Sequence, residues 1–352
     1  MGWEITYIYV LRKRHSMKIL IVTFCSPWGM GEYVKNTLIK MGHNVKLFYT
    51  NSEGKFIERV FNRAKYLKFQ RHNLTKIWQS QVNQRLLKTV AAFRPELLFV
   101  IKGDEIFPEV LADIKNNYKT ILLNWLPDNP FYLGLENVLK AIPIYDYIFT
   151  LDPAHLPQLK AYAKGVVDFL PLCCQPEIHR KINLTEEEIK QYSCDICFIG
   201  TALPERTEIL KKLLDYNLGV WGEGWQKERY WLKEHYRGKA SDEKMVKIYN
   251  ASKIALNIHH PQALEGANLR TFEICGSGTF QLVDNRMSLL QLFRVGKEIV
   301  SFKDVEELKE LIRYFLERDK ERAVIAEGGY RRAHQEHTYL NRLRKIISII
   351  SK

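Results

Sequence analysis

Apolar and polar positions along the chain alternate in two ways, and the alternation predicts an α/β protein. Short apolar runs bounded by Gly, Asp and Asn read as strands, and the intervening stretches repeat apolar residues at helical spacing. In the first half, such a run at 18–24 is followed by a turn, a helix at 32–40 and a second strand, which is a β-loop-α-β unit. Strands that alternate with helices indicate a parallel, doubly wound sheet. The strands expected in this half are 18–24, 45–50, 97–103, 120–128 and 145–152.

A second alternation of strands and helices follows a polar stretch at 175–191 that suits an interdomain connection. The sequence therefore predicts two Rossmann-like, doubly wound domains that face each other across a cleft, where open α/β sheets bind ligands. We expect a first Rossmann-like domain at 17–174, a linker at 175–191, a second at 192–325 and a helical tail at 326–352. The strands expected in the second half are 194–201, 217–222, 254–259, 279–284 and 299–302.

Length and composition agree with a folded two-domain protein. A chain of 352 residues with 46% hydrophobic and 26% charged residues is too long for one core and too apolar for disorder. Residues 1–16 carry their basic cluster after the apolar part, so they do not resemble a secretion signal. Because Met17 precedes the first strand, we expect residues 1–16 to be a dispensable extension. The apolar runs are shorter than the roughly 20 residues of a membrane span.

The net charge of +13 is unevenly distributed along the chain. The window Lys55–Arg94 contains ten Lys and Arg residues against the single acid Glu58, and its apolar residues recur at helical intervals. Two interpretations are open: a solvated helix face over a core, or a surface for an anionic partner such as a membrane. Nucleic acid is a weaker candidate, because basic charge without a recognition motif is unspecific. The six cysteines lack a framework of regular spacings, which favours reduced thiols and a cytoplasmic protein. From the basic window we also expect peripheral association with the inner face of the membrane.

The stretch 263–285, ALEGANLRTFEICGSGTFQLVDN, carries the most informative chemistry. Glu265 and Glu273 lie eight positions apart, which is a rise of about 12 Å on a helix and is comparable to a sugar-diphosphate-ribose ligand. The helix N-terminus between them offers N–H groups and a positive dipole to a diphosphate. Gly266 permits close backbone approach, and Arg270 adds a cation. We therefore hypothesise that this stretch is a donor site.

The segments 194–210, 250–259, 266–284 and 310–342 together resemble the CgeB-like (spore-maturation-type) glycosyltransferases, relatives of the group-1 and group-4 enzymes with the GT-B fold. The sequences that carry the resemblance include CDICFIGTALPERTEIL, NASKIALNIH and GANLRTFEICGSGTFQLVD. In the first half, NWLPDNPF and FLPLCCQPEIH resemble two shorter segments of the same family. One departure is visible, because Ser277 replaces the second glycine of the usual pair.

The resemblance implies a role for each residue of the donor site. Glu273 would hold the ribose hydroxyls, Glu265 would face the transferred sugar, and Asn268 with Arg270 would line the diphosphate. Arg206 would supply a second phosphate cation, and its place after a predicted strand agrees with that role, although a surface arginine at a helix start would look the same.

Asp128 follows a first-half strand in the sequence LPDNP and is the candidate to orient an acceptor hydroxyl or act as base. The alternative is an Asp that merely forms the turn. Because no Asp-x-Asp follows a suitable strand, we expect neither an obligatory metal nor a cofactor. Arg side chains and the helix N-terminus would instead offset the charge of the leaving diphosphate.

These features predict a glycosyltransferase that moves a sugar from a nucleotide diphosphate sugar to a hydroxyl of a glycan, lipid-linked glycan or protein. The two-glutamate pattern resembles retaining relatives of the family. The alternative from another class is a non-catalytic protein that keeps the same fold to bind a nucleotide sugar or a polysaccharide.

Overall fold

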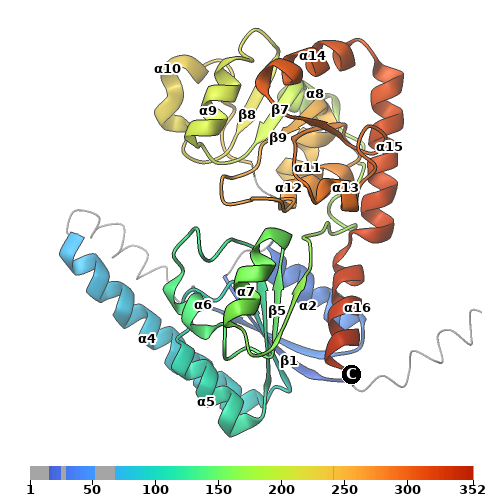
Figure 1. Ribbon diagram of the computed structural model, residues 1–352. Coiled ribbons are helices and arrows are strands. Elements are labelled where there is room, and N and C mark those ends of the chain that lie inside the picture. Colours follow the sequence, from blue (N-terminus) through green and yellow to red (C-terminus); the bar gives the residue numbers. More distant parts are fainter. Residues whose placement is uncertain (1–15, 25–28, 52–67, 241, 352) are drawn as a thin grey trace, which may run out of the picture. The chain divides into compact units, whose positions relative to one another are not determined.

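The computed structural model describes residues 16–24, 29–51, 68–240 and 242–351 (Figure 1). The chain divides into two compact units, each built around its own parallel sheet. Unit 1 comprises residues 1–149 and 158–168, and unit 2 comprises residues 150–157 and 169–352. The predicted α/β class with two Rossmann-like sheets is confirmed.

Unit 1 contains a six-stranded sheet in the order β2-β1-β3-β4-β5-β6. Its central strands are apolar throughout because helices cover parallel sheets on both faces, and Ile19–Val22 and Leu97–Phe99 have no exposed surface. The strands are β1 (Lys18–Thr23), β2 (Asn44–Tyr49), β3 (Leu97–Ile101), β4 (Ile121–Leu126), β5 (Tyr147–Thr150) and β6 (Val166–Phe169). The helices are α2 (Met30–Lys40), α4 (Lys68–Phe93), α5 (Pro108–Tyr118), α6 (Glu136–Ala141) and α7 (Leu156–Tyr162). Before α7, the segment 150–157 of unit 2 forms the short helix η3 (Pro153–His155).

Unit 2 contains a five-stranded parallel sheet in the order β11-β10-β9-β7-β8. The strands are β7 (Cys194–Ile199), β8 (Leu218–Trp221), β9 (Ser252–Asn257), β10 (Gln281–Asp284) and β11 (Val300–Phe302). The helices before the tail are α8 (Glu186–Tyr192), α9 (Pro204–Lys211), η4 (Trp225–Glu228), α10 (Arg229–Leu232), α11 (Asp242–Ala251), α12 (Leu269–Gly276), α13 (Leu289–Leu292) and α14 (Val305–Leu316). The tail forms α15 (Asp319–Glu336) and α16 (Tyr339–Ile350).

The strand order of unit 2 reverses beside β7. From β7 the chain first pairs with β8 on one side and then crosses to β9 on the other. Such a switch point is where open parallel sheets bind ligands, outside the carboxyl ends of the two strands. The loops that follow β7 and β9 are therefore the first places to look for a site.

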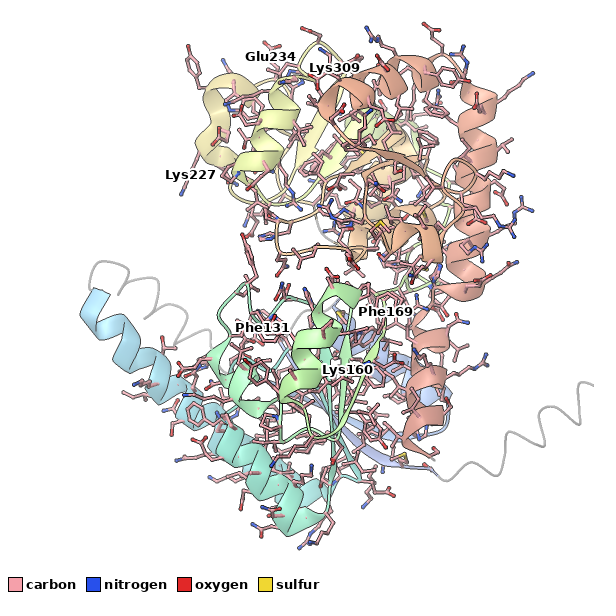
Figure 2. The ribbon with its side chains drawn as sticks, viewed as in Figure 1. Phe131, Lys160, Phe169, Lys227, Glu234 and Lys309 are labelled. Carbon is pink, nitrogen blue, oxygen red and sulfur yellow. The ribbon has the colours of Figure 1, made fainter. Side chains whose placement is uncertain are left out.

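The hydrophobic core of unit 2 anchors the start of the loop that follows β7. Trp225 is fully buried, packs edge-on against Phe198 at 6.0 Å between ring centroids, and donates its indole N–H to the carbonyl of Gly200 at 2.7 Å. Lys227, two residues later in η4, points outward (Figure 2). The end of β7 is thus anchored to a buried aromatic cluster.

The polar stretch 175–191 belongs to unit 2, with residues 169–174 before it. It includes most of α8, whose start is set by a capping box in which Thr185 accepts from the Glu188 N–H. Residues 150–157 also belong to unit 2, although both of their flanks in the chain lie in unit 1. The chain therefore passes between the units three times, where the sequence analysis expects a single linker.

The basic window is described only from Lys68 onward, so its first part and residues 1–15 lie outside the described residues. The described part is a single helix, α4, and from residue 75 onward its side chains are described as well. Val82, Leu86 and Val90, spaced by four, are fully buried against unit 1, while Lys76 and Lys88 are exposed. This half of α4 has one face buried in a core and exposed lysines elsewhere, which both interpretations of the basic window share. Within the described residues, no helix is both long and apolar enough to cross a bilayer.

Candidate functional site

The loop from Ile258 to Asn268 connects β9 to α12 and carries three of the predicted donor-site residues, Glu265, Gly266 and Asn268. Its end is fixed by Asn268, which is the N-cap of α12 and accepts the N–H of Thr271 at 3.0 Å. The amide of Asn257, the last residue of β9, lies 3.0 Å from Asn268 Oδ1 and 2.9 Å from Gln281 Oε1. The cap is therefore tied to two adjacent strands, and the start of α12 has a defined position.

His259 orients the same loop through both ring nitrogens. Its Nδ1 lies 2.6 Å from Asp284 Oδ1, and its Nε2 accepts the N–H of Asn268 at 3.0 Å, so Nδ1 carries the proton. Burial alone would raise the pKa of Asp284, but hydrogen bonds from His259 and the nearby Arg286 charge outweigh it and lower the pKa. The Asn268 N–H is consequently used inside the protein. This leaves the N–H groups of Leu269 and Arg270 without an acceptor in the described chain.

Arg206, in the first turn of α9, spans the two loops of the switch point. Its Nε and Nη2 both donate to the carbonyl of Ile258 after β9, at 3.1 and 2.8 Å, and its Nη1 donates to the carbonyl of Thr201 after β7 at 3.1 Å. The side chain is 8% exposed, and burial lowers its pKa to about 10. Within the described residues no carboxylate forms an ion pair with it, so a buried positive charge is held among neutral oxygens.

Glu273 and Arg270, to which the resemblance gives separate roles, form an ion pair with each other. They are three residues apart in α12 and therefore lie on one face of that helix. Glu273 is 5% exposed, and its second oxygen lies 3.6 Å from Nε2 of His179. Burial lowers the pKa of the His179 imidazole. At Arg270 burial would also lower the pKa of the guanidinium, but the charge of the Glu273 carboxylate outweighs burial and raises that pKa.

Glu265 lies in the middle of the loop, and its carboxylate makes no hydrogen bond or ion pair with the described residues. Its backbone is fixed from both sides. The N–H donates to Asp152 Oδ2 at 3.1 Å, and the carbonyl accepts from Ser288 N–H at 3.0 Å. Glu265 and Glu273 thus differ in environment: one carboxylate is unpaired and half-buried, the other buried and paired.

Gly266 is the point of close approach that its sequence context predicts, but its neighbour in the structure is the chain itself. A Cβ at this position would lie 2.8 Å from the carbonyl oxygen of Leu151 and 2.9 Å from Cα of Asp152. Only a glycine allows this approach, because real Cβ atoms essentially never come within 3.0 Å of a non-bonded heavy atom.

Asp128 belongs to unit 1 and follows β4. Its carboxylate lies 3.7 Å from Nζ of Lys102, which also lies 3.3 Å from Asp104, in the loop that follows β3. Burial would lower the pKa of Lys102, but these two carboxylates outweigh it and raise the pKa. Beside them, burial and the Asp104 charge raise the pKa of Glu105 to about 7. Asp128 is thus one member of a charged group at the carboxyl edge of the first sheet.

The sequence analysis does not find Asp152, Asn257 or Asp284. Each stands at or just beyond the end of a strand, which is the position that could have drawn attention to it. What the sequence cannot supply is the partner, because Asp152 bonds a residue 113 positions later in the chain.

Comparison with known families matches residues 206–348 to a family described as "Glycosyl transferase-like". The matched segment begins at Arg206 and includes the entire loop from Ile258 to Asn268. No curated protein matches the sequence at a significant level.

Solved structures share the fold across nearly the whole chain at low sequence identity. A sucrose-phosphate synthase from Thermosynechococcus elongatus superimposes with a TM-score of 0.70 at 12% identity, covering 96% of this chain and 98% of its own. HepE from Anabaena, solved with UDP-glucose, gives a TM-score of 0.65 at 12% identity, covering 96% and 100%. A glycosyltransferase from Rickettsia africae gives 0.64 at 11% identity, covering 96% and 98%. The two parallel Rossmann-like sheets therefore form the GT-B fold.

Proposed function

We propose that this chain, a nucleotide-sugar glycosyltransferase of the GT-B type, binds a uridine diphosphate sugar at the carboxyl edge of the unit 2 sheet. It transfers the sugar to a hydroxyl of a glycan, lipid-linked glycan or protein, with retention of anomeric configuration and without a metal. Within the GT-B enzymes we assign it to the CgeB-like group on the motifs of its second half.

The observation that carries this proposal is Arg206 at the switch point. This guanidinium bridges the loops after β7 and β9 and forms no ion pair with the described residues, so it places a buried positive charge where such sheets bind ligands. A diphosphate would add negative charge beside this cation, and its interaction with a buried cation is less screened than at a surface. Uridine diphosphate is the choice of nucleotide because HepE, a structural relative, was solved with UDP-glucose.

The start of α12 supports the same assignment. The N–H groups of Leu269 and Arg270 have no acceptor in the described chain, and they lie at the positive end of the helix dipole. A phosphate oxygen accepts such N–H groups readily. The Arg206 guanidinium, which contacts the loop after β9, and the N-terminus of α12 are thus two kinds of positive group at the switch point, and both favour a leaving diphosphate whose charge grows during transfer.

The two glutamates are proposed to bind the two remaining parts of the donor, the transferred sugar and the ribose. The carboxylate of Glu265 has no partner among the described residues, and we assign it to the hydroxyls of the transferred sugar. Glu273 retains acceptor capacity beyond its ion pair with Arg270 and its contact with His179, because a carboxylate has about four lone-pair sites. We assign it to the ribose hydroxyls.

On the acceptor side, Asp128 is the proposed group that orients the attacking hydroxyl, with Lys102 holding its carboxylate. The exposed lysines of α4 are proposed to bring the enzyme to an anionic membrane surface on the cytoplasmic side. Sedimentation with anionic and neutral vesicles tests this part, and equal binding to both would refute it.

The test of the donor site combines UDP release from a panel of UDP sugars with calorimetric binding of UDP. Arg206→Met removes the charge and keeps a long side chain, and we expect UDP affinity to fall on the order of 10- to 100-fold, as for loss of a charged hydrogen-bonding group. Arg313→Met, at an exposed position of α14, is the matched control and should leave affinity unchanged.

Equal UDP affinity in the wild-type protein and Arg206→Met would contradict the assignment. Tight UDP-sugar binding without release of UDP in the presence of any acceptor would support the alternative of a binding protein. Turnover that survives EDTA is expected, and NMR of the product's anomeric proton checks retention.

A further inference from the structure

The carboxylate of Asp152 is a buried anchor for the loop that carries Glu265. Its side chain has no exposed surface, and its Oδ2 accepts the N–H groups of Leu264 at 2.8 Å and Glu265 at 3.1 Å. Its Oδ1 accepts the N–H of Ala154 at 3.0 Å. Backbone N–H groups therefore stabilise the charge, through hydrogen bonds that are stronger than those between neutral groups.

No lysine or arginine of the described chain shares this carboxylate. The nearest titratable side chain is that of His155, whose Nε2 lies 3.7 Å from Asp152 Oδ2 and has no hydrogen-bond partner. Burial lowers the pKa of His155, so the ring is neutral near pH 7. The Asp152 carboxylate thus accepts hydrogen bonds from backbone N–H groups and forms no ion pair with a lysine or arginine of the described chain.

The peptide of Glu265 is held on its other side as well. Its carbonyl accepts from Ser288 N–H, and the adjacent Gly266 packs against the backbone of Leu151 and Asp152. The backbone of Glu265 is therefore fixed in both directions, while its carboxylate bonds to no side chain or backbone group in the part of the chain that the structure describes. A side chain presented in this way is prepared for a ligand, because its supporting contacts hold the geometry in advance.

We propose that Asp152 is a positioning residue for sugar transfer: it does not contact the donor, and it acts by fixing the Leu264–Gly266 backbone so that Glu265 meets the transferred sugar. This inference rests on the donor site proposed above. It adds a residue from the 150–157 segment, which belongs to unit 2 but lies between two stretches of unit 1 in the chain.

The experiment compares the wild-type protein with Asp152→Asn, which keeps the side-chain size but turns one acceptor oxygen into an NH₂ group facing a backbone N–H. We expect kcat for transfer to fall on the order of 10- to 100-fold, the usual effect of misplacing a reacting group by about 1 Å. UDP affinity should change less than about threefold, because Arg206 and the α12 N-terminus are untouched. Hydrogen exchange of the Leu264 and Glu265 amides should accelerate.

Two further variants separate positioning from general destabilisation. Asp152→Ala should lower kcat more than Asp152→Asn, since it removes both oxygens. Leu308→Ala opens a cavity at a fully buried position of α14 and should lower thermal stability while kcat per UDP-binding site stays at the wild-type value.

The inference about Asp152 is overturned, with the donor site left standing, if Asp152→Asn keeps the wild-type kcat per UDP-binding site. Unchanged hydrogen exchange at residues 264 and 265 has the same consequence. So does a loss of kcat that only parallels a loss of UDP-binding sites, as in an unstable protein. A wild-type protein that binds neither UDP nor UDP sugars overturns the proposed donor site and this inference with it.

Discussion

His337 links the stability of unit 2 to pH, and the size of the effect follows from its surroundings. The ring is 5% exposed, its Nε2 donates to the carbonyl of Leu292 at 2.7 Å, and its Nδ1 accepts from Arg342 Nη2 at 2.8 Å. Protonation would place a new N–H against a guanidinium inside the core. Burial first, and the Arg342 charge second, therefore lower the pKa of His337 to about 4.

The direction of the pH effect follows from comparing the folded and unfolded chains. The unfolded histidine takes up its proton near pH 6.5, whereas the folded one does so only near 4. Between these values the unfolded state binds more protons, so stability falls as pH falls. The contribution is fully present above about pH 6.5 and amounts to about 3 kcal/mol, of which about 2.5 kcal/mol is lost by pH 4.5.

The perturbation that isolates this effect is His337→Gln, because a glutamine can donate to Leu292 and accept from Arg342 but does not titrate. We expect the free energy of unfolding of the wild-type protein to fall between pH 8 and 4.5 by about 2.5 kcal/mol more than that of the variant. Urea unfolding followed by tryptophan fluorescence measures this, since unit 2 contains the buried Trp221 and Trp225. Identical pH dependence in the two proteins would refute the reasoning.

Two further predictions concern the loop between β9 and α12. Gly266→Ala should displace the loop from Leu151 and Asp152, cost about 1–3 kcal/mol of stability and reduce turnover, measured by urea unfolding and UDP release. Gly296→Ala strains a positive φ in open space and should cost stability with turnover intact; equal turnover in both variants would contradict the prediction. Asn268→Ala removes the α12 cap and should cost about 1–2 kcal/mol and weaken UDP binding in calorimetry. Asp304→Ala removes the equivalent cap of α14 and should leave UDP affinity unchanged, so a parallel loss of affinity there would argue against a specific role for Asn268.

The elements of this protein follow closely from local pattern. The strands at Cys194–Ile199 and Gln281–Asp284 and the helix at Met30–Lys40 lie within one or two residues of their predicted positions. The reason is physical: a buried parallel strand must be apolar throughout, and a helix must be apolar on one face, so each leaves its period in the sequence. The two sheets, and the loop after the third strand of the second sheet as a candidate site, were therefore predictable.

What the tertiary structure alone decided is which groups meet. Asp152 reaches the Glu265 loop from 113 residues away, and Arg206 reaches Ile258 across 52. Glu273, expected to act apart from Arg270, is paired with it, because three residues on a helix share a face and burial makes an unpaired charge costly. Such contacts leave no periodic trace, since a hydrogen bond between distant residues depends on how the strands are ordered in the sheet. The sequence by itself determined the fold class and the place of the candidate loop after β9, and the tertiary structure determined the charges and hydrogen bonds that hold that loop in position.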